Sequence, residues 1–127
     1  MTAPEHLRYT KDEEWVAVDG DIGTVGITDY AQDQLGAVVF VELPAVGAAL
    51  EQGKVLGAVE STKAVSDIFS PVSGEVVEAN ESLVDAPETV NDDPYGKGWL
   101  VKVKLSAPQE LDGLLSAADY QALDREE

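Results

Sequence analysis

Short apolar segments separated by glycine and proline dominate the pattern along the chain. Residues 74–81 (GEVVEANE) and 98–105 (GWLVKVKL) alternate apolar and polar side chains, which is the pattern of a strand with one buried face. Residues 37–44 (AVVFVELP) form a continuous apolar run of strand length that a proline ends. Residues 54–60 (KVLGAVE) and 66–71 (SDIFSP) are two further candidate strands. The pattern therefore predicts a mainly β protein built as a small sandwich or barrel.

Two turns are predicted from residue type. Residues 14–28 (EWVAVDGDIGTVGIT) indicate a hairpin with Asp19 and Gly20 in its tight turn, because glycine tolerates a positive φ. Residues 91–99 (NDDPYGKGW) contain Asp-Pro-Tyr-Gly, the preferred residues of a type I turn. This loop is either a plain turn before the strand at Trp99 or an exposed recognition loop. No linker or composition shift indicates a second domain, so we expect one domain over residues 1–127.

Helices are expected to be few and short. Thr28 is a suitable N-cap for a helix of about two turns, which Gly36 can end in the left-handed conformation. At the C-terminus, Ser116 and Asp119 form a capping-box-like pair at the start of a second helix. Residues 107–115 (APQELDGLL) predict a short helical turn before it.

The charge of the chain excludes two classes of partner. There are 25 acidic and 8 basic residues, and the formal net charge is −17. Binding to nucleic acid or to an anionic membrane requires clustered lysine and arginine. We therefore expect neither partner, and the acidity reflects either the surfaces that the partners meet or a salty habitat.

The chain lacks most of the side chains and motifs that enzymes use for catalysis. The chain has no cysteine and one histidine, His6, which removes disulfides, thiolate metal sites and a Ser-His-Asp triad. The acid pairs Glu13-Glu14 and Asp92-Asp93 are not accompanied by a nucleotide or calcium motif, so we expect no enzyme. No apolar run approaches the ~20 residues of a membrane helix, and residues 1–15 lack the apolar core of a signal peptide. We expect a cytoplasmic protein.

Lys63 is the one basic residue within residues 57–71 (GAVESTKAVSDIFSP). It lies between two candidate strands, so we expect it at the tip of a hairpin. An exposed lysine amine is protonated at neutral pH and is a poor nucleophile, so it suits acylation by another enzyme better than catalysis. From the residues alone, a modified lysine and an ordinary solvated turn lysine both stay open.

Five blocks of the sequence, in order, resemble the glycine cleavage system H protein family. The most characteristic block surrounds Lys63, at residues 60–67 (ESTKAVSD). The others are residues 14–16 (EWV), 26–36 (GITDYAQDQLG), 38–44 (VVFVELP) and 90–100 (VNDDPYGKGWL). The resemblance covers nearly the whole chain.

The resemblance implies that Lys63 carries lipoic acid as an amide. The turn recognised for this modification would contain Glu60, Ser61, Thr62 and Ala64. The cofactor would supply the reactive sulfurs that a chain without cysteine lacks. The family is non-catalytic, and its fold is a flattened β-barrel or sandwich, the barrel-sandwich hybrid of biotinyl and lipoyl domains. Short peripheral helices, including one at the C-terminus, would complete it.

The resemblance also implies a monomeric carrier with four kinds of partner. A glycine decarboxylase (P protein) would load an aminomethyl group onto the arm, and an aminomethyltransferase (T protein) would remove the one-carbon unit. A dihydrolipoyl dehydrogenase (L protein) would reoxidise the dithiol, and a lipoate ligase or lipoyl transferase would attach the cofactor. Glu14 and Asp67 are our candidate contacts for the positively charged end of the loaded arm. The alternative is that both are solvated surface acids.

Three residues depart from the family pattern: Glu13 where histidine is common, Thr62 where valine is common, and Ala37 where an acid is common. None of them removes Lys63. A biotinyl domain would place methionine on both sides of the lysine, and a lipoyl domain of a 2-oxo acid dehydrogenase would lack the block at residues 90–100. An H-like carrier in a lipoate-relay or redox pathway stays open, as does a binding module with an unmodified lysine.

Overall fold

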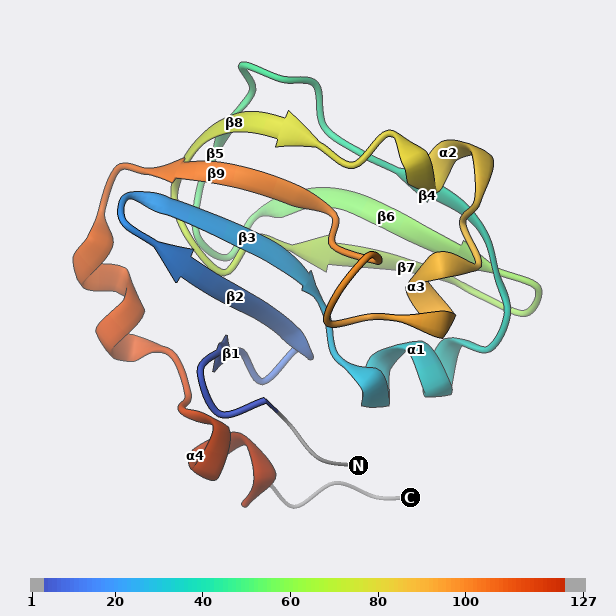
Figure 1. Cartoon of the computed structure of the whole chain (residues 1–127), viewed down its shortest axis with the longest axis horizontal. Coiled ribbons are helices and arrows are strands. Elements are labelled where there is room, and N and C mark those ends of the chain that lie inside the picture. The colour runs from blue at the N-terminus through green and yellow to red at the C-terminus, as the bar shows by residue number, and fades with distance from the viewer. Residues whose placement is uncertain (1–3, 123–127) are drawn as a thin grey trace.

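Two antiparallel β-sheets form the body of the molecule in the computed structural model, which describes residues 4–122 (Figure 1). The larger sheet has the strand order β1-β2-β3-β9-β8-β5, and the smaller has the order β4-β6-β7. Over the described residues the two sheets do not close into a barrel. The predicted mainly β fold is confirmed in its sandwich form. The strands are β1 (Arg8–Tyr9), β2 (Glu14–Asp19), β3 (Ile22–Ile27), β4 (Val38–Glu42), β5 (Ala49–Leu50), β6 (Val55–Ser61), β7 (Val65–Phe69), β8 (Gly74–Ala79) and β9 (Val101–Leu105).

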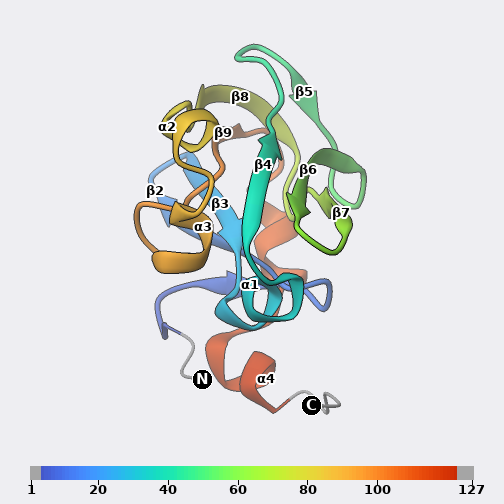
Figure 2. The same ribbon diagram turned by 90° about the vertical axis from the view of Figure 1, so that its right-hand side faces the viewer.

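Short helices lie at the edges of the sheets. Figure 2 shows α1 at the foot of β4 with α3 beside both, while α4 packs near β1. The predicted C-terminal helix and the helical turn before it are confirmed, whereas the pattern did not predict α2, α3, β1 or β5. The helices are α1 (Asp29–Leu35), α2 (Ser82–Asp85), α3 (Thr89–Asp92), the 3-10 helix η1 (Pro108–Gly113) and α4 (Ala117–Gln121).

The main core lies between the two sheets. Along β9 the side chains of Val101, Val103 and Leu105 are buried, and the lysines between them are half-buried or exposed. Val25 of β3 and Val59 of β6 belong to the same core and are fully buried. Each fully buried valine contributes about 1.5–3 kcal/mol relative to an exposed one. The alternating pattern read from the sequence thus corresponds to one buried face of the larger sheet.

The hairpin of β2 and β3 confirms the first predicted turn with a shift of one residue. Asp19 pairs with Ile22, so the two turn residues are Gly20 and Asp21 and not Asp19 and Gly20. Gly20 has a φ of 65°, a value that glycine adopts without steric cost. The sequence rule found the right glycine but placed it second in the turn, where the structure has it first.

The caps of the two predicted helices are confirmed. The Thr28 hydroxyl oxygen accepts from Ala31 N–H at 3.1 Å, and the Ser116 hydroxyl oxygen accepts from Asp119 N–H at 3.1 Å. Gly36 does end α1, with a φ of 83°, but its ψ of −159° lies outside the left-handed helical region. The chain therefore leaves α1 in an extended direction, and the expected left-handed termination is wrong.

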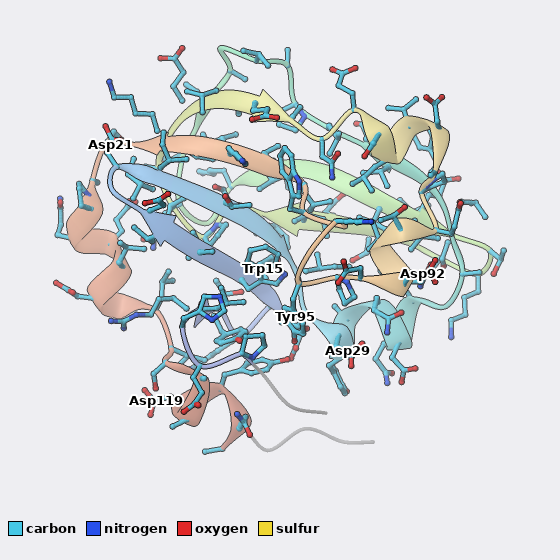
Figure 3. The ribbon with its side chains drawn as sticks, viewed as in Figure 1. Trp15, Asp21, Asp29, Asp92, Tyr95 and Asp119 are labelled. Atoms are coloured by element: carbon cyan, nitrogen blue, oxygen red, sulfur yellow. The ribbon has the colours of Figure 1, made fainter. Side chains whose placement is uncertain are left out.

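The predicted turn at residues 93–96 is present and is held by an aromatic pair. Gly96 N–H donates to the Asp93 carbonyl at 3.1 Å, and the Trp15 indole N–H donates to the Pro94 carbonyl at 3.1 Å. Figure 3 shows Trp15 near Tyr95, and their ring centroids are 6.2 Å apart. Because Trp15 is the second residue of β2 and is buried, the turn is fixed to the larger sheet.

Candidate functional site

Lys63 lies in the turn between β6 and β7, as predicted. Ser61 organises this turn, because its N–H donates to the Ala64 carbonyl at 2.8 Å and its hydroxyl oxygen accepts from two backbone N–H groups. These donors are Lys63 at 3.3 Å and Ala64 at 3.1 Å. Ser61 is buried, whereas Glu60, Thr62, Lys63 and Ala64 are exposed. The turn thus has an anchored base and an amine within reach of another protein.

The turn rests against the segment that joins α1 to β4. Thr62 N–H donates to the Ala37 carbonyl at 3.1 Å. Gly36 lies beside the lysine side chain, since a Cβ placed on Gly36 would be 3.4 Å from Cε of Lys63. Two of the three departures from the family pattern, Ala37 and Thr62, therefore meet through their backbones. This bond depends on neither side chain.

A groove of about 230 Å³ runs between α1 and β7, the strand that follows the lysine. Its lining combines aliphatic side chains with acids and other polar groups, which suits a hydrocarbon chain with a charged end. Asp67 of β7 is in this lining and is exposed. The aliphatic lining residues are Ile27, Ala31, Leu35 and Ile68; the others are Asp12, Glu13, Tyr30, Gln34, Ser66 and Asp67.

Glu14 is the first residue of β2, and its side chain lies beside Phe69, at the end of β7 farther from Lys63. It is buried, with 2% of its surface exposed. The Thr10 hydroxyl donates to Oε1 at 2.6 Å, and Phe69 N–H donates to Oε2 at 3.3 Å. Burial raises the pKa of Glu14 to about 7, although both hydrogen bonds favour the charged form and act in the opposite direction. The expectation that Glu14 is an ordinary solvated surface acid is therefore excluded.

Glu14 and Asp67 line neighbouring cavities and not a single one. A second cavity of about 280 Å³ is lined by Glu14, Thr10, Gln52, Phe69 and Ser70 among others. Asp12 lines both this cavity and the groove. Sequence reasoning missed Asp12 and the α1 residues of the groove, because no local pattern indicates which side chains the packing of α1 on β7 brings together.

The adjacent acids Glu13 and Glu14 point to different partners. Glu13 has a φ of 73°, in the left-handed region, and its Oε1 accepts from the Thr28 hydroxyl at 2.8 Å and from the Tyr120 hydroxyl. Glu13 thus connects the N-cap of α1 to α4. Glu13, the third residue that departs from the family pattern, thus makes hydrogen bonds of its own, and these are separate from the hydrogen bonds of Glu14.

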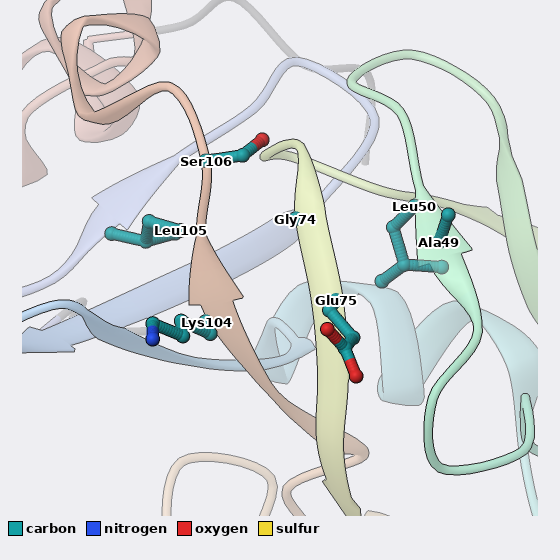
Figure 4. A pocket seen from close by; sticks show the side chains of 7 residues that line it. All are labelled: Ala49, Leu50, Gly74, Glu75, Lys104, Leu105 and Ser106. Carbon is teal, nitrogen blue, oxygen red and sulfur yellow. The ribbon is translucent and has the colours of Figure 1, made fainter.

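A larger open groove of about 520 Å³ lies between β5, β8 and β9 (Figure 4). Figure 1 places this end of β8 and β9 across the molecule from the β6–β7 turn. Its lining includes the cross-strand pair Glu75 and Lys104. Among residues 4–122 there is no group of three or more acidic or histidine side chains arranged to hold a metal ion. Nor does this part of the chain contain a helix long and apolar enough to cross a membrane.

The sequence as a whole matches one protein family. The family model described as Glycine cleavage H-protein matches residues 7–127. The chain belongs to the glycine cleavage H-protein family. The glycine cleavage system H protein of Carboxydothermus hydrogenoformans is 54% identical over 124 residues, which is 98% of this chain and 95% of that protein. That of Beijerinckia indica is 61% identical over 114 residues, or 90% and 92% of the two chains.

A solved structure agrees with this assignment. The crystal structure of a glycine cleavage system H protein from Mycobacterium marinum superposes with a TM-score of 0.86 and 44% identity, covering 93% of this chain and 95% of that one. Members of the glycine cleavage H-protein family are lipoyl carriers with lipoate on a lysine, and they are not enzymes. The expected family, carrier function and cofactor are confirmed.

Proposed function

We propose that Lys63 is the lipoyl attachment site and that the chain, as one domain over residues 1–127, carries the aminomethyl group derived from glycine. The observation that supports this most strongly is the β6–β7 turn: an exposed amine on a turn that Ser61 anchors, beside a groove along the next strand. A lipoate ligase or lipoyl transferase recognises the turn through Glu60, Ser61, Thr62 and Ala64.

Lipoate would supply a disulfide that is reduced when glycine loses CO₂ and one sulfur takes up the aminomethyl group, and the dithiol left after transfer would be reoxidised to the disulfide. The residues of the chain shield and orient this arm. The aliphatic side chains of the groove cover its hydrocarbon part, and Asp67 and Glu14 attract its cationic end. With a pKa of about 7, Glu14 is about half charged at neutral pH in the absence of the cation. Its charged form attracts the cationic end more strongly than Asp67 does, because it lies in a less hydrated environment.

The carrier works as a cytoplasmic monomer between three enzymes. It receives the aminomethyl group from glycine decarboxylase, delivers it to the aminomethyltransferase and is reoxidised by dihydrolipoyl dehydrogenase. The membership of the family supports contact with the other glycine cleavage components.

Intact-mass analysis after incubation with a lipoate ligase, ATP and lipoate tests the attachment site. We expect one lipoyl increment on the wild type and none on Lys63→Arg, with the modified peptide of the wild type containing residue 63. A lipoyl increment that persists in Lys63→Arg, or an unmodified wild type under conditions that modify a known carrier, would overturn the proposal.

A further inference from the structure

Asn91 of α3 uses its side-chain amide to hold both ends of a three-residue segment. Nδ2 donates to the Gly36 carbonyl at 2.8 Å and to Gln32 Oε1 at 3.0 Å. Oδ1 accepts from Val38 N–H at 2.8 Å. Asn91 thus uses both of its N–H donors and its carbonyl oxygen on groups at the end of α1 and the start of β4.

Each residue of this segment, Gly36–Val38, faces the Lys63 turn. Gly36 lies beside the lysine side chain, and the Ala37 carbonyl accepts from Thr62 N–H. Val38 pairs with Ser61, the residue whose hydroxyl organises the turn. Figure 2 shows the arrangement of elements that makes this possible, with α3 next to α1 and to the start of β4.

We propose that Asn91 is a positioning residue for Lys63: by fixing Gly36 and Val38 it sets the place of the Ala37 carbonyl, which in turn fixes the tip of the turn. The inference rests on the proposed attachment of lipoate to Lys63. An enzyme that modifies one lysine of a folded protein must receive that lysine in a defined position, so a mobile turn lowers the rate of modification.

The physical basis is the number of backbone groups that depend on one side chain. Removing the amide leaves the carbonyl of half-buried Gly36 and the N–H of buried Val38 without these partners, which favours a shift of the segment. Gly36 offers little resistance to such a shift, because glycine adopts many backbone conformations. Thr62 N–H then loses the fixed position of its acceptor.

The chain offers a control in Asn80, which is buried, whereas Asn91 is half-buried. Its Nδ2 donates to the carbonyls of Lys97 at 2.9 Å and Trp99 at 2.7 Å, and its Oδ1 accepts from the Ser82 hydroxyl at 2.6 Å. None of these bonds involves the Gly36–Val38 segment or the turn. Asn80→Ala removes the same number of hydrogen bonds without touching the proposed positioning path.

The test compares full-length Asn91→Ala and Asn80→Ala with the wild type in two measurements. The first is amide hydrogen exchange of Thr62 N–H by NMR on the unmodified protein. The second is kcat/KM of a lipoate ligase with the chain as substrate, at a temperature where thermal unfolding shows all three proteins to be folded. For Asn91→Ala we expect Thr62 exchange to be roughly tenfold faster and kcat/KM to fall roughly fivefold. Asn80→Ala should stay within about twofold of the wild type in both.

Three results would overturn the proposal: unchanged Thr62 exchange in Asn91→Ala, faster exchange with unchanged modification, or an equal loss of modification in Asn80→Ala. If Asn91→Ala does not fold, the wild type itself provides the test. The N–H groups of Thr62 and Val38 should then have similar protection, and a much faster Thr62 would refute the inference. A wild type that takes up no lipoate contradicts the proposed function, whereas the exchange data still decide whether Asn91 holds the turn.

Discussion

The two ends of β7 place single ionisable groups in opposite environments. Before the strand, Lys63 is exposed on a turn held by backbone hydrogen bonds and by Ser61. At its far end, Phe69 N–H donates to Glu14, a carboxyl group with 2% exposure whose pKa burial raises to about 7. In the proposed function, these two environments serve different requirements: the lysine proposed for modification is accessible, and the acid proposed to attract the cargo is shielded from water.

The largest expected effect concerns the pH dependence of stability at the buried end. The pKa of Glu14 is raised from 4.5 to about 7 on folding, so the folded state binds this proton more tightly than the unfolded state. Its contribution is fully present below about pH 4.5 and is lost as pH rises towards 7. Glu14→Gln should lack this loss. Its free energy of unfolding relative to the wild type should therefore rise by roughly 2–3 kcal/mol between pH 5 and pH 8.

Urea unfolding of both proteins at each pH measures this difference, because the other acids are common to the two chains. Lys63→Ala is the matched control at the exposed end and should show no such change. A constant difference between Glu14→Gln and the wild type from pH 5 to pH 8 would mean that Glu14 titrates normally.

The next effect concerns protection of the cargo. In the loaded carrier, Glu14→Gln should shorten the lifetime of the aminomethyl group roughly tenfold, because a charge-assisted hydrogen bond in a shielded place is lost. Asp67→Asn should shorten it only about two- to fivefold, since exposed charge pairs contribute less. Release of formaldehyde or ammonia from the isolated loaded protein provides the measurement. Unchanged lifetimes in both variants would contradict a role for these acids.

A smaller effect is expected at the base of the turn. Ser61→Ala removes the acceptor for the N–H groups of Lys63 and Ala64, which should lower the free energy of unfolding by about 1 kcal/mol. It should also slow attachment of lipoate, because the amine becomes less well placed. Thermal unfolding and a lipoylation time course check the two parts. Thr62→Ala, which keeps its backbone bond to Ala37, serves as the control for the stability part and should leave the free energy of unfolding nearly unchanged.

The smallest effect is expected at the exposed lysine itself. Lys63→Arg should change the free energy of unfolding by less than about 0.5 kcal/mol, since an exposed side chain is replaced by a similar one. Chemical denaturation measures it. A decrease in the free energy of unfolding above about 1 kcal/mol, roughly the upper value for an exposed ion pair, would show that the lysine stabilises the fold. That result would contradict the description of Lys63 as an exposed side chain without a structural role.

Local patterns predicted the elements whose signals are local. The alternation in β9 and the caps Thr28 and Ser116 are confirmed. In β8 the alternation is interrupted at Val77 and Glu78, which are both exposed and where the register with β9 shifts. The strands β1 and β5 have two residues each, too few for an alternating pattern to appear. β5 depends on its pairing with β8 further along the chain, and β1 depends on its pairing with β2 and on the bridge between Tyr9 and Leu115.

The candidate site divides in the same way. Lys63 between two strands could be placed on a turn, because strand patterns flank it on both sides. The burial of Glu14 could not be predicted, since it depends on β7 and on Thr10 folding over one member of an acid pair. The hydrogen bonds from Asn91 to Gly36 and Val38 join residues 55 and 53 positions apart, so no local sequence pattern predicts them.

The most direct test of the account is a reconstituted glycine oxidation assay. The lipoylated wild type and Lys63→Arg, taken through the same lipoylation reaction, are each combined with glycine decarboxylase, the aminomethyltransferase, dihydrolipoyl dehydrogenase, tetrahydrofolate and NAD⁺. The account predicts glycine-dependent NADH formation with the wild type and only background with Lys63→Arg. Equal rates with the two proteins, or no activity with a fully lipoylated wild type, would contradict it.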